Sequence, residues 1–293
     1  MLFRSADFSG LPLVYVVGAP RSGTTLLYQL ISRYLQVGYI NNLIARFWMR
    51  PAVGIRLSQA IIGSTGRNQV ALRSLHGTTE GVEGPHEFGY FWRHWLKLDE
   101  SPTHHLDAAS IRCVDCNGLK LALEQEILGN FGCPVVFKNV ICGFQAELLT
   151  RIHPASLFVH IVRNTGDTAA SILASRMERY GSYATWWSLK PSTWPFKEVA
   201  TPVEEALQQV LECRKEFRME LSREGLNSME VNYEELCLNP VSILDRIRQA
   251  INALGGALPK TNQPVECLSP STAWKLPAEI QEELKMKRAL LKE

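Results

Sequence analysis

The stretch Leu13–Thr25, LVYVVGAPRSGTT, carries the strongest fold signal in this chain. Its first half, Leu13–Gly18, is a short apolar run rich in β-branched residues, which is typical of a buried strand. Leu26–Leu35 then has apolar residues at helical spacing, so the sequence predicts a strand, a turn and a helix. The two glycines of Gly18–Thr25 permit a tight turn whose backbone N–H groups can surround an anion at the helix N-terminus.

The turn departs from the best-known phosphate-binding loop in one position. Gly18 and Gly23 have the spacing of the kinase and ATPase P-loop, G-x-x-x-x-G-K-[ST], but Thr24 stands where that motif has lysine. A P-loop lysine reaches the β- and γ-phosphates, and the next hydroxyl holds Mg²⁺. An arginine placed earlier in the loop suits a shorter anion, a phosphate with a sulfate attached, and needs no metal. The predicted contacts are Arg21, Ser22, Gly23, Thr24 and Thr25.

The remainder of the chain alternates between strand and helix patterns. Apolar runs predict strands at Pro134–Lys138, Leu157–Val162 and Met229–Tyr233. Helical spacing is found in Phe144–Ile152, Thr168–Tyr180, Pro202–Glu224 and Pro240–Leu254. This alternation predicts an α/β fold with a mostly parallel sheet flanked by helices. We expect one domain over residues 1–293, with an insertion of helices and loops at about 41–130.

Composition argues against a nucleic-acid-binding protein, a disulfide-rich protein and a membrane-spanning protein. The chain is 46% hydrophobic and 20% charged with a net charge of +2, so no global basic field points to nucleic acid. Seven cysteines, an odd number, do not indicate a disulfide framework. Met1–Gly10 has no signal-peptide apolar region, and no uncharged apolar run is long enough to span a membrane. We therefore expect a cytoplasmic protein.

Three segments together resemble a known family. Gly18–Leu27, GAPRSGTTLL, resembles the 5′-phosphosulfate loop of sulfotransferases that use PAPS (3′-phosphoadenosine 5′-phosphosulfate). Arg163–Ser171, RNTGDTAAS, resembles their 3′-phosphate motif, in which an arginine ends a strand and a serine follows in the next helix. Val231–Leu236, VNYEEL, resembles a third segment, whose tyrosine, here Tyr233, lies near the nucleotide.

The resemblance implies a P-loop NTPase-like nucleotide fold and a transferase activity. The enzyme would move a sulfuryl group from PAPS to a hydroxyl or amine and release PAP (3′,5′-adenosine bisphosphate), with no metal. Arg163 and Ser171 would bind the 3′-phosphate through charge-assisted and hydroxyl hydrogen bonds. Lys138 and Arg21 would counter the charge on the bridging oxygen as its bond to sulfur breaks. The acceptor would be a small molecule, a carbohydrate or a lipid.

The sequence departs from the family pattern at the positions of the usual base. Lys138-Asn-Val140 keeps the lysine of the cytosolic branch but has valine where that branch has its catalytic histidine. Gly38–Asn42 ends in asparagines where the carbohydrate branch often has a glutamate. Ser271–Lys275, STAWK, matches only in part the C-terminal 3′-phosphate loop of the cytosolic branch. The nearest general match is therefore the bacterial type, and the base assignment cannot be transferred.

The stretch Glu80–Leu98, EGVEGPHEFGYFWRHWLKL, is the richest in candidates for a base. Its aromatic residues follow one helical face, with Pro85 as the expected first helical residue: Phe88, Phe91, Trp92 and Trp95. On such a helix His86 projects away from the aromatic residues and Glu87 lies on their flank. The aromatic face is expected to be core rather than an acceptor platform.

We predict Glu87 as the general base, with His86 as the alternative and Glu83 in reserve. The competing interpretation is that Glu87 only complements the positive end of the helix dipole. Trp186, Trp187 and Trp194 either border the acceptor pocket or belong to the core. Two other functions stay open, a P-loop nucleotide kinase and a nucleotide-binding module without catalysis. A kinase predicts a lysine after Gly23, which the sequence lacks.

Overall fold

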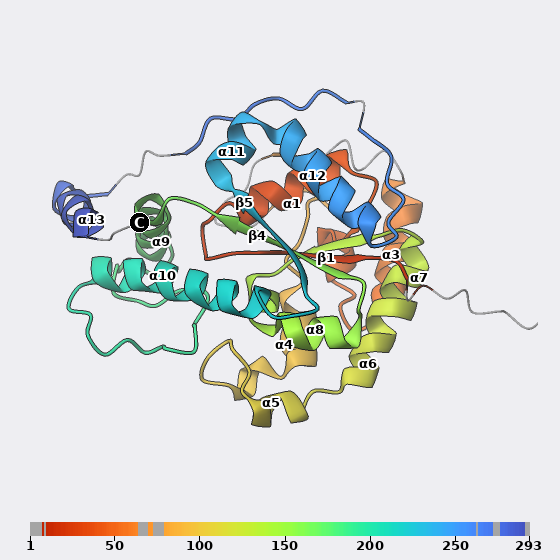
Figure 1. Ribbon diagram of the computed structural model, residues 1–293, viewed down its shortest axis with the longest axis horizontal. Helices are drawn as coiled ribbons and strands as arrows, with labels where there is room; N and C mark the ends of the chain where they lie inside the picture. Colours follow the sequence, from red (N-terminus) through yellow and green to blue (C-terminus); the bar gives the residue numbers. More distant parts are fainter. Residues whose placement is uncertain are drawn as a thin grey trace, which may run out of the picture.

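Five parallel strands form one sheet in the part of the chain that the structure describes. The structure is a computed structural model and describes residue 8 and residues 10–63, 70–72, 79–261, 263–271 and 276–290. The strand order is β2-β3-β1-β4-β5, and every pairing is parallel (Figure 1). The strands are β1 (Leu13–Val17), β2 (Gly38–Tyr39), β3 (Val135–Lys138), β4 (Ser156–Val162) and β5 (Asn227–Asn232).

Helices cover both faces of the sheet, as Figure 1 shows. One face carries α1 (Thr24–Tyr34), α11 (Tyr233–Leu238) and α12 (Pro240–Ala253), and the other carries α4 (Gly89–Leu96), α8 (Ala146–Ile152) and α10 (Pro202–Leu221). Helix α9 (Thr165–Tyr180) packs on α10, and α13 (Ala278–Leu290) packs on both. The predicted α/β fold with a parallel sheet between helices is confirmed.

The segment between β2 and β3 is helical and irregular. It contains α2 (Asn42–Ala45), α3 (Pro51–Ile62), the 3₁₀ turn η2 (Leu98–Glu100), α5 (Ala108–Arg112), α6 (Cys116–Leu121), the π-helical turn η3 (Ala122–Leu128) and α7 (Gly129–Phe131). A further 3₁₀ segment, η4 (Val140–Gln145), follows β3 directly and contacts β1 and α10.

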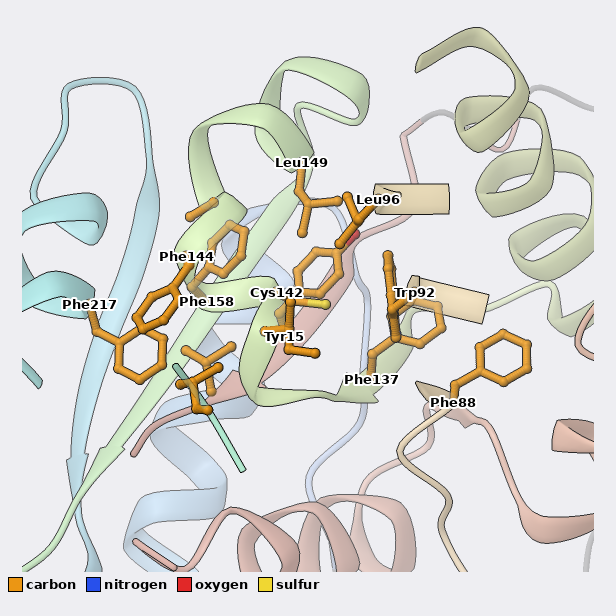
Figure 2. Close-up of a cluster of buried hydrophobic side chains, with 14 of the residues drawn as sticks. Tyr15, Phe88, Trp92, Leu96, Phe137, Cys142, Phe144, Leu149, Phe158 and Phe217 are labelled. Carbon is orange, nitrogen blue, oxygen red and sulfur yellow. The ribbon is translucent and has the colours of Figure 1, made fainter. Parts of the chain in front are cut away.

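Alternation along β1 divides the core into two layers. Tyr15 and its face of the strand point into the cluster in Figure 2, whereas Val14 and its face pack under α1 and α12. The ring of Tyr15 stacks on Phe158 at 4.9 Å between centroids and on Phe137 at 5.7 Å. Trp92 of α4 meets Tyr15 edge-on at 5.9 Å. Burial on both faces explains the near-continuous apolar pattern of the central strands.

Two details differ from the sequence-based expectation. Strand β2 is only two residues long, too short to give an alternating pattern. The expectation that Pro85 begins a helix is wrong, because Pro85 pairs with Asn41 in a β-bridge and α4 starts only at Gly89. Pro85 and His86 instead pair with the residues that follow β2, since the His86 N–H also donates to the Ile40 carbonyl at 2.8 Å. The aromatic prediction is confirmed for Phe88, Phe91 and Trp92, which are buried, whereas Trp95 is only partly buried and packs against the core.

Candidate active site

A cavity of about 780 Å³ lies at the carboxyl edge of the sheet. Its lining includes Arg21 from the loop after β1, Lys138 at the end of β3, Arg163 directly after β4 and Tyr233 directly after β5. Strand order changes direction at β1, so the loops after β1 and β4 diverge and leave a crevice between them. Open α/β sheets bind their ligands at this switch point.

The first loop is held by a close contact between backbone and ring. Gly23 has φ +102°, and a Cβ placed there would lie 2.3 Å from Cδ2 of Tyr233. Only glycine satisfies both the backbone angle and the contact. Arg21 also has a positive φ, +67°, which is uncommon for a residue with a side chain, and such residues cluster at active sites. The backbone of this loop is therefore fixed by Gly23 and its contact with Tyr233, and it holds Arg21 in an unfavourable conformation.

The loop residues do not all reach the cavity. Gly23, Thr24 and Thr25 line it, and α1 begins at Thr24, so its first N–H groups point toward the cavity. Ser22 is 2% exposed, does not line the cavity, and its hydroxyl has no hydrogen-bond partner among the described residues. Of the five residues predicted from the loop, Ser22 is the one whose side chain lies elsewhere.

Arg21 connects the two predicted phosphate motifs. Its Nε donates to the hydroxyl of Ser171 at 2.9 Å, and its backbone carbonyl accepts from Nη1 of Arg163 at 3.2 Å. Ser171 is buried behind Arg21 and does not itself line the cavity. These contacts bring together residues that are far apart in the sequence, from the loop after β1 and from the end of β4 and the helix after it.

Arg163 and Tyr233 form the other end of the cavity. The guanidinium of Arg163 lies over the Tyr233 ring, 4.5 Å from its centroid, and Nη2 donates to the carbonyl of Ser271. The Ser271 N–H donates to the Tyr233 hydroxyl at 3.3 Å. Ser271 therefore lies beside the cavity, whereas the other residues of the STAWK stretch, 272–275, lie outside the described residues.

Glu87 and Lys138 form an ion pair in the cavity. Lys138 is the last residue of β3 and its side chain is 6% exposed, whereas that of Glu87 is 45% exposed. The next residue, Asn139, holds the same segment, since its Nδ2 donates to the Glu87 carbonyl at 3.1 Å. Glu87 is therefore positioned by its contacts with Lys138 and Asn139 at the end of β3. It lies before the first turn of α4. The helix-dipole interpretation of Glu87 stays a competing interpretation, since Glu87 lies only two residues before α4 begins.

His86 lines the cavity next to Glu87. Burial lowers the pKa of the imidazole, with Lys138 adding to the decrease and Glu87 opposing it, so the ring is neutral at pH 7. Its Nδ1 accepts a hydrogen bond from the Phe88 N–H at 2.9 Å. The neutral ring therefore carries its proton on Nε2 and presents a donor to the cavity. Glu83, the reserve candidate, is not among the residues that line the cavity.

Positive charge dominates the cavity. Its lining includes five cationic side chains, Arg21, Arg93, Lys138, Arg163 and Arg179, against the single carboxylate of Glu87. Burial lowers the pKa of the Arg21 guanidinium, and the charges of Arg163 and Arg179 lower it further. An anion bound here would relieve this repulsion. The cavity is therefore suited to a ligand with several negative charges.

Sequence reasoning missed several lining residues. Arg179 lies eight residues after Ser171 on α9, about 80° around the helix axis from it, so helical spacing alone does not identify it. Tyr90 and Arg93 line the cavity from α4, one helical turn apart. Trp187, for which two interpretations were open, lines the cavity, and the Arg179 guanidinium lies 5.2 Å from its ring centroid. Val140 and Asn42 also line it.

The described residues show neither a metal-binding cluster nor a membrane-spanning helix. In that part of the chain no group of three or more His, Cys, Asp or Glu side chains is arranged to hold a metal ion. None of the helices described there is long and apolar enough to cross a membrane.

Comparison with known proteins gives the class of the chain. The sequence model of the sulfotransferase family matches residues 12–253. The chain therefore belongs to the sulfotransferase family, and the activity that the family defines is sulfuryl transfer. A search of curated proteins found no match.

Three matches to solved structures are described as sulfotransferases, all at low identity. STF9 from Mycobacterium avium is 15% identical with a TM-score of 0.48, and the match covers 96% of this chain and 68% of that one. STF1 from Mycobacterium tuberculosis H37Rv is 13% identical with a TM-score of 0.45, over 94% and 71%. The sulfotransferase from Alicyclobacillus acidocaldarius is 16% identical with a TM-score of 0.44, over 95% and 92%.

Proposed function

We propose that the protein transfers a sulfuryl group from PAPS to a hydroxyl or amine of an acceptor molecule and releases PAP. The observation that carries the proposal is the 2.9 Å hydrogen bond from Arg21 to Ser171, which joins two phosphate-type motifs at one cavity. PAPS has anionic groups at both the 3′ and 5′ positions of its ribose and so uses both motifs. ATP has no 3′-phosphate and would leave the second motif without a ligand.

The donor would lie across the carboxyl edge of the sheet. Thr24 and Thr25 at the N-terminus of α1, with Arg21, would hold the 5′-phosphate and sulfuryl oxygens. Arg163 would hold the 3′-phosphate, and Ser171 would act through its bond to Arg21 or by turning its hydroxyl to the ligand. Tyr233, stacked under Arg163, would border the adenosine. The excess of positive charge in the lining supports a ligand of this charge.

Glu87 would act as the general base. Its carboxylate would accept the proton of the acceptor hydroxyl as the acceptor oxygen forms its bond to sulfur. The bond between sulfur and the bridging oxygen would break, and its electron pair would stay on PAP. Lys138 and Arg21 would counter that charge. Two contacts support this role: Asn139 holds the Glu87 backbone, and the ion pair places the carboxylate next to Lys138, the lysine that would face the leaving oxygen.

His86 is better suited to donate a hydrogen bond than to accept a proton. Its Nδ1 is already an acceptor for the Phe88 N–H, so the nitrogen available to a ligand carries hydrogen. We therefore keep Glu87 as the base, and we assign to His86 a contact with the sulfuryl group or the acceptor.

Transfer of labelled sulfate from PAPS to an acceptor panel of phenols, sugars and lipid alcohols tests the proposal. Labelled product with at least one acceptor, absent in Glu87→Gln, is the expected result. Tight PAP binding without product from any acceptor would favour a nucleotide-binding module instead. Transfer of phosphate from ATP with Mg²⁺ would favour a kinase.

A further inference from the structure

Helix α3 exposes a line of apolar side chains. Val53, Leu57 and Ile61 are 51%, 36% and 64% exposed, and their spacing places them on one helix face. Met49, in the turn before the helix, is 69% exposed. The opposite face supplies the buried Ile55, so the helix is already anchored to the core. We call Met49, Val53, Leu57 and Ile61 the apolar ridge; in Figure 1 α3 lies at the right-hand side of the molecule.

The ridge is flanked by arginines. Between Asn41 and Thr79 the sequence has five arginines and no aspartate or glutamate. Three of these arginines are in the described part next to the ridge and exposed: Arg46, Arg50 and Arg56. One carboxylate from elsewhere approaches them, that of Glu126, 3.7 Å from Arg50. An exposed apolar line with flanking positive charge is unusual on a surface that contacts only water.

We propose that the apolar ridge docks the protein onto the surface of an anionic membrane. The ridge would enter the boundary between headgroups and acyl chains, and Arg46, Arg50 and Arg56 would contact the lipid phosphates. Amphipathic helices with this division of apolar and basic residues bind membranes in this way without crossing them.

Charge and shape favour a bilayer over a second copy of the chain. A two-fold symmetric contact would bring each arginine-flanked ridge against its own copy, and like charges would face one another. Neither of the two cavities described is lined by a residue of α3, so the helix offers a ridge rather than a groove. A fluid bilayer interface accommodates a ridge of this kind.

The ridge begins beside the cavity. The ring of Trp48, next to Met49, stacks on Tyr90 at 6.3 Å between centroids, and Tyr90 is a 72% exposed residue of the cavity lining. Membrane docking would therefore bring this part of the cavity rim close to the lipid surface. If the proposed sulfuryl transfer holds, the acceptor reached there is an alcohol or phenol dissolved in the membrane.

Co-sedimentation with vesicles tests the docking. Phosphatidylcholine vesicles that also contain phosphatidylglycerol should bind the protein, and vesicles of phosphatidylcholine alone should bind it more weakly. The variant V53S/L57S/I61S should bind the anionic vesicles about tenfold less tightly or worse. The variant R46Q/R50Q/R56Q should lose about fivefold in affinity for the anionic vesicles per arginine removed. Added salt should likewise weaken the binding of the parent protein to these vesicles.

A matched control removes the same kind of side chain elsewhere. Met219, Val241 and Met286 are 63%, 53% and 64% exposed, so M219S/V241S/M286S should bind vesicles as the parent does. Melting temperatures of the ridge variant and of this control should decrease to a similar small extent, because each places three serines in helices. Equal vesicle binding by the ridge variant and this control would overturn the proposal. So would a dimer in sedimentation equilibrium that the ridge variant dissociates, with no vesicle binding. Neither result depends on sulfuryl transfer.

Discussion

The Nε of Arg21 donates a 2.9 Å hydrogen bond to the hydroxyl of Ser171, 150 residues further along the chain. Arg21 follows β1 and Ser171 lies in the helix after β4, and these strands are neighbours in the sheet. Parallel neighbours end at the same edge, so the strand order alone brings the two motifs together. The lining of the cavity beside them has five cationic side chains and one carboxylate, that of Glu87, and Arg93 is also paired with Asp99, which lies outside the lining.

Arg163→Ala should weaken recognition of the 3′-phosphate selectively. Loss of a charge-assisted hydrogen bond typically costs about 1.5–3 kcal/mol, which corresponds to a decrease of about 10- to 150-fold in PAPS affinity. Adenosine 5′-phosphosulfate, which lacks the 3′-phosphate, should bind about as well as to the parent. Calorimetry with both nucleotides gives the comparison.

Arg163→Lys is the control for that experiment. Lysine keeps the charge but cannot bond two acceptors with a planar fork, so its effect should be intermediate. Arg163 also bonds the Arg21 and Ser271 carbonyls. An equal loss of affinity for both nucleotides would mean that Arg163 acts only through those backbone contacts.

Glu87→Gln should lower turnover by about 10²–10⁴-fold, because glutamine keeps the size of the side chain but cannot take a proton. PAP affinity should change little, because the proposed donor contacts come from other segments. Turnover, PAP affinity and melting temperature should be measured on the same preparation. His86→Ala is the matched variant: if it is inactive while Glu87→Gln turns over normally, the base is the histidine. If both are active, the proton acceptor lies elsewhere.

Gly23→Ala should destabilise the fold and reduce nucleotide binding. Gly23 combines φ +102° with a Tyr233 ring atom 2.3 Å from an added Cβ. Gly225→Ala is the control, since Gly225 has φ +81° but nothing within 4 Å of the added atom. Backbone strain alone costs about 1–3 kcal/mol and should appear in both variants. Denaturant unfolding should show a larger loss for Gly23→Ala, and equal losses would mean that the Tyr233 contact is not restrictive.

His105 should make stability depend on pH. Its hydrogen bond to Glu216 raises the pKa of the imidazole in the folded protein, with burial opposing the increase. The contribution is fully present below about pH 6.5, the ordinary value, and is lost as pH rises through the raised value. The difference in unfolding free energy between the parent and His105→Gln should therefore shrink as pH increases above neutrality. A difference that grows with pH would contradict the assignment.

The fold could be predicted from the sequence because its signals are local. The loop Gly18–Thr25 and the apolar runs of the central strands each lie within a few residues, and burial on both faces gives them a distinct composition. Strand β2 was missed because two residues are too few to show the alternation of apolar and polar residues that marks a strand. The start of α4 was misplaced because Asn41 and Ile40, more than forty residues earlier, pair with Pro85 and His86.

The candidate site was predictable only in part. Arg21, Arg163 and Tyr233 stand in motifs, so the sequence identifies them directly. Glu87 was proposed from a helix that does not include it, and its actual position depends on Lys138 and Asn139. The sequence contains no local sign of a contact between these segments.

The most direct test of the account is calorimetry of PAP binding in the presence of EDTA, with ATP and Mg²⁺ as the comparison. We expect PAP to bind tightly and removal of metal to leave its affinity unchanged, because two phosphate motifs supply the contacts and Thr24 replaces the P-loop lysine. ATP binding that is tighter than PAP binding and requires Mg²⁺ would contradict it.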